Sequence, residues 1–149
     1  TMESILVSAC LLGVSCRYDA KSKPNENVIG LIKKYNLIPV CPETLGGMAT
    51  PRLPSERKGN KVVSKCGDDV TKHFVHGAEE ALRLANMYGC KKAVLKEKSP
   101  SCGFGKIYDG TFSGTLINGN GVAADLLSAA GIAVFGENSS ELIDMVNND

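Results

Sequence analysis

Residues 5–10 read Ile-Leu-Val-Ser-Ala-Cys, and residues 37–43 read Leu-Ile-Pro-Val-Cys-Pro-Glu. Each segment is a short apolar run that ends in a turn containing a cysteine. This pattern predicts a buried β-strand in both places. The two runs therefore predict two buried strands that are well separated along the chain and that each end at a cysteine.

The segment between the two runs predicts a helix over residues 25–35. Its apolar side chains recur at helical spacing, and Asn25 or Asn27 can cap its first turn. The apolar residues are Val28, Leu31 and Ile32. Strand, helix and strand together predict a β-α-β unit at the start of the chain.

The remaining elements continue the alternation. Asp68 or Asp69 starts a long helix that ends before Gly89, where a glycine stops it. Its apolar face comprises Val70, Phe74, Ala78, Ala81, Leu82, Ala85 and Tyr88. Further segments are predicted as a strand at 93–95, a helix at 122–130, a strand at 132–135 and a helix from Ser139 or Ser140 to Val146. This order predicts an α/β fold of three layers, Rossmann-like, with a mostly parallel sheet and helices on both faces.

The 149 residues are expected to form one domain, 1–149, because that length supports a single core. Residues 45–61 contain three glycines and two prolines, a density of helix and strand breakers that predicts a long ordered loop. Since it follows the turn at Cys41, this loop is expected to be functional.

Charge and composition favour a small-molecule partner. Lysine and arginine number 17 against 16 acidic residues, and aromatic side chains make up only 5%, so a nucleic-acid partner is disfavoured. No apolar run reaches the roughly 20 residues that cross a bilayer, and no secretory signal is recognised, so we expect a cytoplasmic protein without a membrane partner. The sequence does not determine the oligomeric state.

Three of the six cysteines follow predicted strands. In parallel sheets, ligands bind beyond the carboxyl ends of the strands, so Cys10, Cys41 and Cys102 are expected to converge there. In a reducing compartment such thiols indicate metal binding or catalysis before disulfides. For Cys66 and Cys90, near helix ends, packing is the favoured interpretation.

Cys16 lies one short turn beyond Cys10, and its role stays open between cluster ligand, sulfur acceptor and packed thiol. His73 and His76 lie three residues apart on the long helix, where a surface or core-edge position is favoured over a metal site. The glycines Gly114, Gly119 and Gly121 give only weak support to a dinucleotide site.

Several motifs, taken as a set, resemble those of the thiouracil-desulfurase-like family. They are Ser8-Ala9-Cys10-Leu11-Leu12-Gly13 with Cys16-Arg17-Tyr18-Asp19, Cys41-Pro42-Glu43 with Gly46-Gly47, and Ser99-Pro100-Ser101-Cys102-Gly103. The likeness extends over nearly the whole chain, including Pro51-Arg52 and Asp69-Val70-Thr71. One departure is Ala20, where relatives commonly carry glycine, and alanine is expected to tighten or shift that loop.

The resemblance implies a 4Fe-4S cluster held by Cys10, Cys41 and Cys102, with the fourth iron open to the sulfur of a thiocarbonyl substrate. It implies that Glu43 transfers protons and activates water, and that Ser99 orients substrate or water. The expected activity is non-redox desulfuration of a thiolated nucleobase or a similar thiolated heterocycle, with release of sulfide. Two alternatives remain: a non-catalytic module that carries metal or sulfur, and a thiol-redox protein that uses Cys10 and Cys16.

Overall fold

The computed structural model describes residues 2–147. The strands are β1 (Ser4–Ser8), β2 (Asn36–Val40), β3 (Ser55–Lys58), β4 (Lys61–Ser64), β5 (Lys92–Leu95), β6 (Lys106–Tyr108), β7 (Leu116–Asn118) and β8 (Ala133–Gly136). The helices are α1 (Glu26–Gly30), α2 (Pro42–Leu45), α3 (Thr71–Met87), α4 (Val122–Ala129) and α5 (Ser140–Asn147), with short 3-10 helices η1 (Ala9–Leu12) and η2 (Leu31–Lys33). Within this part of the chain, no helix is both long enough and apolar enough to cross a membrane.

The central sheet confirms the predicted strand arrangement. Its order is β2-β1-β5-β8, and all its pairs are parallel. Leu6 of β1 lies opposite Ile38 of β2 and Ala93 of β5. All four carboxyl ends therefore lie at one edge of the sheet, as the sequence predicts.

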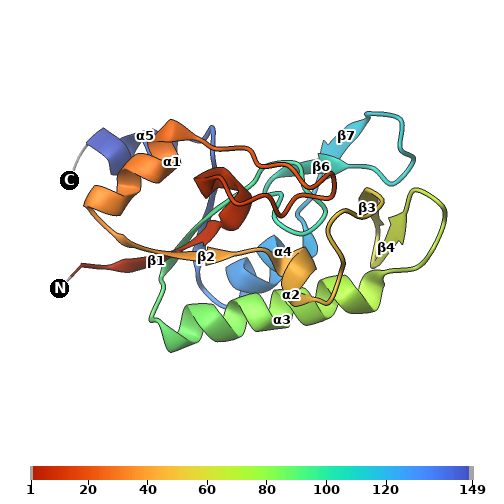
Figure 1. Ribbon diagram of the computed structural model, residues 1–149, viewed down its shortest axis with the longest axis horizontal. Coiled ribbons are helices and arrows are strands. Elements are labelled where there is room, and N and C mark those ends of the chain that lie inside the picture. Colours follow the sequence, from red (N-terminus) through yellow and green to blue (C-terminus); the bar gives the residue numbers. More distant parts are fainter. Residues whose placement is uncertain (1, 148–149) are drawn as a thin grey trace.

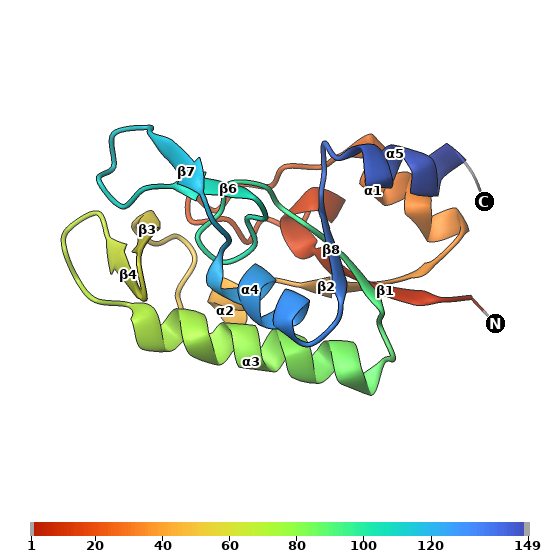
Figure 2. The ribbon, with the colours of Figure 1, turned by 180° about the vertical axis from the view of Figure 1, so that it is seen from behind.

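Helices cover both faces of the sheet, and Figures 1 and 2 show α1 and α5 on one side with α3 and α4 on the other. Successive side chains of a strand point to opposite faces. Ile5 and Val7 pack in the cluster that includes residues of α1 and α5, whereas Leu6 packs with residues of α3 and α4. The fold is thus the three-layer α/β arrangement expected from the sequence.

Two predicted helix starts are confirmed by side-chain hydrogen bonds, whereas the N-cap of α3 is Val70 and not the predicted Asp68 or Asp69. The Asn25 amide oxygen accepts the N–H of Val28 at 3.2 Å, and the Ser139 hydroxyl oxygen accepts the N–H of Leu142 at 3.2 Å. At the end of α3, Gly89 adopts a left-handed φ of 67°, which glycine tolerates best. Tyr88 was predicted to lie on the buried face of α3, but it is 52% exposed because the helix ends at Met87.

Two hairpins, β3–β4 and β6–β7, differ from the sequence prediction. The segment 45–61 was expected to be irregular throughout, yet it contains β3 and the first residue of β4. Its breakers lie before β3 or at the turn, where Gly59 takes a φ of 62°. The two hairpins lie side by side at one end of the molecule, and β3 contacts β6 (Figures 1 and 2).

Candidate functional site

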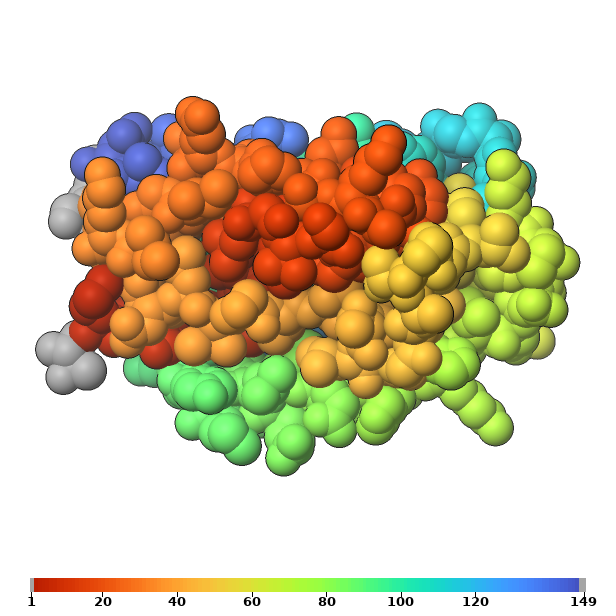
Figure 3. All heavy atoms as spheres, viewed as in Figure 1, coloured from red at the N-terminus to blue at the C-terminus, as the bar shows by residue number. Residues whose placement is uncertain are grey.

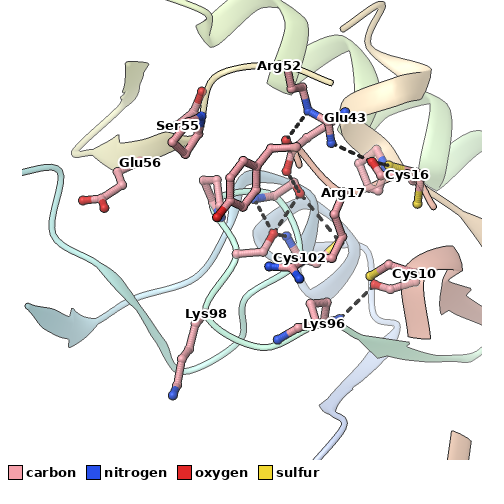
Figure 4. Close-up of a pocket in the computed structure, with 18 of the residues that line it drawn as sticks. Cys10, Cys16, Arg17, Glu43, Arg52, Ser55, Glu56, Lys96, Lys98 and Cys102 are labelled. Atoms are coloured by element: carbon pink, nitrogen blue, oxygen red, sulfur yellow. Dashed lines mark hydrogen bonds and ion pairs between the residues drawn. The ribbon is translucent and has the colours of Figure 1, made fainter. Parts of the chain in front are cut away.

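A cavity of about 440 Å³ lies at the carboxyl edge of the sheet, and Cys10, Cys41 and Cys102 all line it. The prediction that these three cysteines meet at this edge is confirmed. Glu43 and Ser99, the other two expected site residues, line the same cavity. Figure 4 shows Cys10, Cys16 and Cys102 grouped near Glu43 and Arg52.

Each of the three cysteines follows a different strand of the central sheet. Cys10 lies in η1, directly after β1, and Cys41 is the residue between β2 and α2. Cys102 lies in the turn after β5, where its N–H donates to the Ser99 hydroxyl oxygen at 2.9 Å. The order β2-β1-β5 makes these strands neighbours, so residues far apart in sequence reach one cavity.

The Glu43 carboxylate is held from two sides. Its Oε1 accepts a hydrogen bond from Arg52 Nε at 3.0 Å, and its Oε2 accepts one from the Ser101 hydroxyl at 3.0 Å. The side chains of Arg52 and Glu43 are only 6% and 15% exposed. A charge-assisted bond with so little exposure fixes the carboxylate in one orientation beside the cysteines.

The short helix α2 carries Glu43, and two glycines hold it against α3. A Cβ atom on Gly77 would lie 1.8 Å from the Pro42 carbonyl oxygen, and one on Gly46 would lie 2.0 Å from the His73 carbonyl oxygen. Neither position has space for a larger residue. The close contact between the backbones of α2 and α3 thus fixes the position of α2, and with it the position of Glu43.

Arg52 binds four groups at once. Besides Glu43, its Nη1 donates to the Ala49 carbonyl and the Thr50 hydroxyl, and its Nη2 donates to the Cys16 carbonyl at 2.9 Å. The backbone N–H of Arg52 also donates to the Tyr18 carbonyl. Figure 3 shows the segment after β1 and the segment before β3 adjoining on one face, where Arg52 connects them.

Ser99 and Ser101 have different contacts. The Ser99 hydroxyl oxygen accepts the N–H groups of Ser101 and Cys102, and it is 3.0 Å from the Ser101 hydroxyl. Ser101, not Ser99, contacts Glu43. Since Ser101 donates to the carboxylate, its oxygen is left to accept the hydrogen of Ser99, which gives a relay from Ser99 through Ser101 to Glu43.

The protein environment moves the thiols in opposite directions. Burial raises the pKa of Cys10 to about 11, opposed by the positive charge of Lys96, and burial raises the pKa of Cys102 to about 12. Hydrogen bonds from the Cys16 thiol and the Thr44 hydroxyl lower the pKa of Cys41 to about 6 against the effect of burial. The hydrogen bond between Cys16 and Cys41 raises the pKa of Cys16, and burial raises it further.

All six cysteines are free thiols, and their surroundings separate them. Cys16 is buried and forms its thiol hydrogen bond with Cys41. Cys90 is buried, as predicted, but Cys66 is exposed and bonds Ser64 and Asp68, so the packing interpretation was wrong for Cys66. Its position in the turn after β4, outside any core layer, explains the exposure.

The other sequence expectations have clear outcomes. His73 and His76 lie on the exposed side of α3, as predicted, and the His73 ring contacts the Gly46 carbonyl at 2.8 Å. Ala20 has a left-handed φ of 60°, a conformation that glycine adopts more readily than alanine. Across residues 2–147, no group of three or more cysteine, histidine or acidic side chains is placed to hold a single metal ion.

Sequence reasoning missed several cavity residues. Ser101 lies within one of the family motifs, but the resemblance implies a role only for its neighbour Ser99. Arg52 also lies in a motif, and a lone arginine beside two prolines has no pattern that indicates its target. Tyr108 and Phe112 on the second hairpin also line the cavity, and only the fold brings them there.

Together, the doubly covered parallel sheet and the cavity of thiols with a fixed carboxylate define an α/β protein with a small-molecule site at its strand ends. Comparison with known proteins identifies its family. The family model of 2-thiouracil desulfurase matches residues 5–139, and the chain belongs to this family. The resemblance expected from the motifs is thereby confirmed.

Two relatives match almost the full chain. The uncharacterized protein YbbK of Bacillus subtilis (strain 168) is 43% identical over 152 residues, covering 95% of this chain and 99% of that protein. The solved structure of the [4Fe-4S]-dependent thiouracil desulfidase TudS superposes with a TM-score of 0.89 at 46% identity, and the match covers 95% of each chain.

Proposed function

We propose that this protein is a 4Fe-4S-dependent desulfurase that removes sulfur from a thiolated pyrimidine such as 2-thiouracil and releases sulfide. The observation that carries the proposal is the meeting of Cys10, Cys41 and Cys102 with Glu43 in one cavity. Membership of the 2-thiouracil desulfurase family and the close structural match to TudS support it. The cavity volume of about 440 Å³ lies in the range of small-molecule sites.

Cys10, Cys41 and Cys102 line one cavity and supply the thiolate donors of an iron–sulfur cluster. Thiolates are the usual ligands of iron–sulfur clusters. A 4Fe-4S cluster held by these three thiolates would supply Lewis-acid chemistry toward the substrate sulfur.

Glu43 is proposed as the general base and acid. Its carboxylate takes one proton from water as the water oxygen attacks the thiocarbonyl carbon, and it passes this proton to the sulfur. It then takes the second proton from the new hydroxyl group and passes it to the sulfur as the sulfur departs. The carbon–sulfur bond breaks as the carbonyl forms, so thiocarbonyl plus water yields carbonyl plus hydrogen sulfide. No electron is gained or lost in this balance, which agrees with a non-redox reaction.

Arg52 and the two serines are proposed to keep Glu43 ready for this transfer. The Arg52 guanidinium keeps Oε1 oriented, and Ser101 does the same for Oε2. Ser99 contributes through its contact with Ser101 and orients the edge of the cavity next to Cys102. A carboxylate fixed in this way needs little reorganisation during the proton transfer.

The test is anaerobic reconstitution with iron and sulfide, followed by incubation with 2-thiouracil. We expect bound iron and equal amounts of released sulfide and uracil. Wild-type protein that binds iron but releases no sulfide would favour the non-catalytic module. Oxidation of an added thiol reductant by the protein, in place of hydrolysis of 2-thiouracil, would favour the thiol-redox alternative.

Single cysteine variants test the ligand set. Cys10→Ser, Cys41→Ser and Cys102→Ser are each expected to lose iron and activity. Cys66→Ser is the matched control, because Cys66 is an exposed thiol outside the cavity. Normal iron content in any of the three variants, or equal loss in the control, would contradict the assignment.

The wider setting of the protein is also a proposal. We infer that residues 1–149 act as one domain, supported by the family match over residues 5–139. The free thiols support work in a reducing compartment such as the cytoplasm. A thiolated heterocycle, rather than nucleic acid, remains the proposed partner, and gel filtration will give the oligomeric state.

A further inference from the structure

The lining of the cavity includes a strained aromatic residue that belongs to the second hairpin. Phe112 lines the cavity, is partly buried, and has a φ of 56°. Only glycine, and sometimes asparagine or aspartate, adopts this left-handed conformation readily. Such a residue persists only where its surroundings hold it, and strain of this kind concentrates at ligand sites.

Glu56 of β3 provides the restraint. Its Oε1 accepts the N–H of Gly110 at 3.0 Å and the N–H of Phe112 at 3.1 Å, so one carboxylate fixes the backbone on both sides of Thr111. Figure 4 shows Glu56 pointing away from the cysteines, which agrees with a role in the wall and not in the reaction.

The rest of the turn reinforces the same conformation. A Cβ atom on Gly110 would lie 2.9 Å from the Cβ of Lys58, so the turn packs directly on β3. Asp109 closes the loop with its N–H to the Thr115 carbonyl at 3.0 Å, and its carboxylate accepts the N–H of Thr111. Contacts from both hairpins therefore hold Phe112 in the cavity wall.

A phenyl ring has no polar group with which to bind a substrate, so its contribution is a flat apolar face. A thiolated pyrimidine is a flat ring of matching character, and stacking of a base on an aromatic side chain contributes substantially to binding. We propose that Phe112 is a specificity-determining residue that stacks on the heterocycle, and that Glu56 is the positioning residue that holds it there. The proposal rests on the proposed function and deepens it by assigning the ring-binding surface.

The test compares Phe112→Leu with Phe104→Leu in the reconstituted enzyme. Phe104 is 40% exposed and does not line the cavity, so it is a matched control. For Phe112→Leu we expect the KM for 2-thiouracil and the inhibition constant for uracil to rise about 10-fold, a typical effect of losing one base-stacking contact. The kcat and iron content are expected to stay within about 2-fold, because uniform binding changes KM and not kcat.

Two further variants separate the ring from the backbone strain. Phe112→Gly suits the left-handed backbone but has no ring, so it is expected to raise KM at least as much as Phe112→Leu. Phe112→Tyr keeps the ring and is expected to retain a KM close to wild type. A wild-type KM in Phe112→Gly would show that the turn, not the ring, matters, and would overturn the stacking assignment.

Glu56 is tested by the same constants. Glu56→Gln keeps an oxygen that accepts both N–H groups and is expected to behave like wild type, whereas Glu56→Ala is expected to raise KM. Equal KM values in Glu56→Ala and wild type would overturn the positioning role. An active wild type with unchanged constants in Phe112→Leu overturns only this inference, whereas an inactive wild type overturns the proposed function as well.

Discussion

The cavity has two walls that are held in place by different forces. The cysteine wall, defined by Cys10, Cys41 and Cys102, follows strands that are paired in the central sheet and covered by helices on both faces. The hairpin wall, defined by Ser55, Glu56, Tyr108 and Phe112, belongs to two short two-stranded ribbons.

The hairpin wall is connected to the rest of the molecule by the buried side chains of Val62 and Ile107, by a backbone bond from Val70 to Val62, and by polar side chains. Arg57 Nη1 donates to the Asp125 carboxylate at 2.6 Å and to the Asn120 carbonyl at 2.7 Å. A two-stranded ribbon has little stability of its own, so such contacts determine its position. This difference predicts that substitutions near the cysteine wall alter the reaction rate, whereas substitutions in the hairpin wall alter substrate binding and the stability of the fold.

The largest effect is expected for Glu43→Gln, which keeps the shape of the side chain but cannot take up a proton. We expect kcat to fall by about 100- to 10,000-fold, the usual contribution of a general acid–base group, with iron content unchanged. Glu79→Gln, on the exposed side of α3, is the control. Full activity in Glu43→Gln would remove Glu43 from the mechanism.

Arg52→Lys tests how far Glu43 depends on its partner. Lysine keeps the charge but cannot reproduce the planar fork that reaches Glu43, Thr50 and the Cys16 carbonyl together. We expect activity to fall about 10- to 100-fold, as for other residues that orient a metal-site group. Arg83→Lys on the helix surface should be neutral, and a neutral Arg52→Lys would mean that charge alone suffices.

Arg57→Gln tests the attachment of the hairpin wall. Loss of the bonds to Asp125 and Asn120 is expected to lower the free energy of unfolding by about 1 kcal/mol. Arg83→Gln removes an exposed pair with Glu80 and should change it by less than about 0.5 kcal/mol. Urea unfolding with equal m-values measures both, and equal small changes would show that the ion pair does not hold the hairpin.

The smallest effect, and the only stabilising one, is expected for Ala20→Gly. Alanine at a φ of 60° is strained by about 1–2 kcal/mol, and glycine relieves this at an entropic cost of about 0.5–1 kcal/mol. The unfolding free energy should rise by about 0.5 kcal/mol. Ala133→Gly in β8, where no such strain exists, should lower it, and a loss of stability in Ala20→Gly would contradict the strain argument.

Local patterns in the sequence determined the central layers. Apolar runs such as Ile5-Leu6-Val7 specify buried strands, and residues such as Asn25 and Ser139 start helices through bonds to their own neighbours. These interactions join residues only a few positions apart, so the local sequence pattern is enough to predict them. The convergence of the cysteines was predictable for a related reason, since parallel strands place their carboxyl ends at one edge.

Only the tertiary structure decided the partners of the site residues and the hairpin wall. The contact of Ser101 with Glu43 joins residues 58 positions apart, and that of Arg57 with Asp125 joins residues 68 positions apart. Residues 55–64 are mainly polar, so their hydrophobic pattern does not predict strands. The hairpin of β3 and β4 is held by contacts with β6 and α4, which exist only in the folded protein. Sequence by itself thus determined that Cys10, Cys41 and Cys102 lie at one edge of the sheet, whereas long-range packing decided which side chains orient Glu43 and which aromatic rings line the cavity.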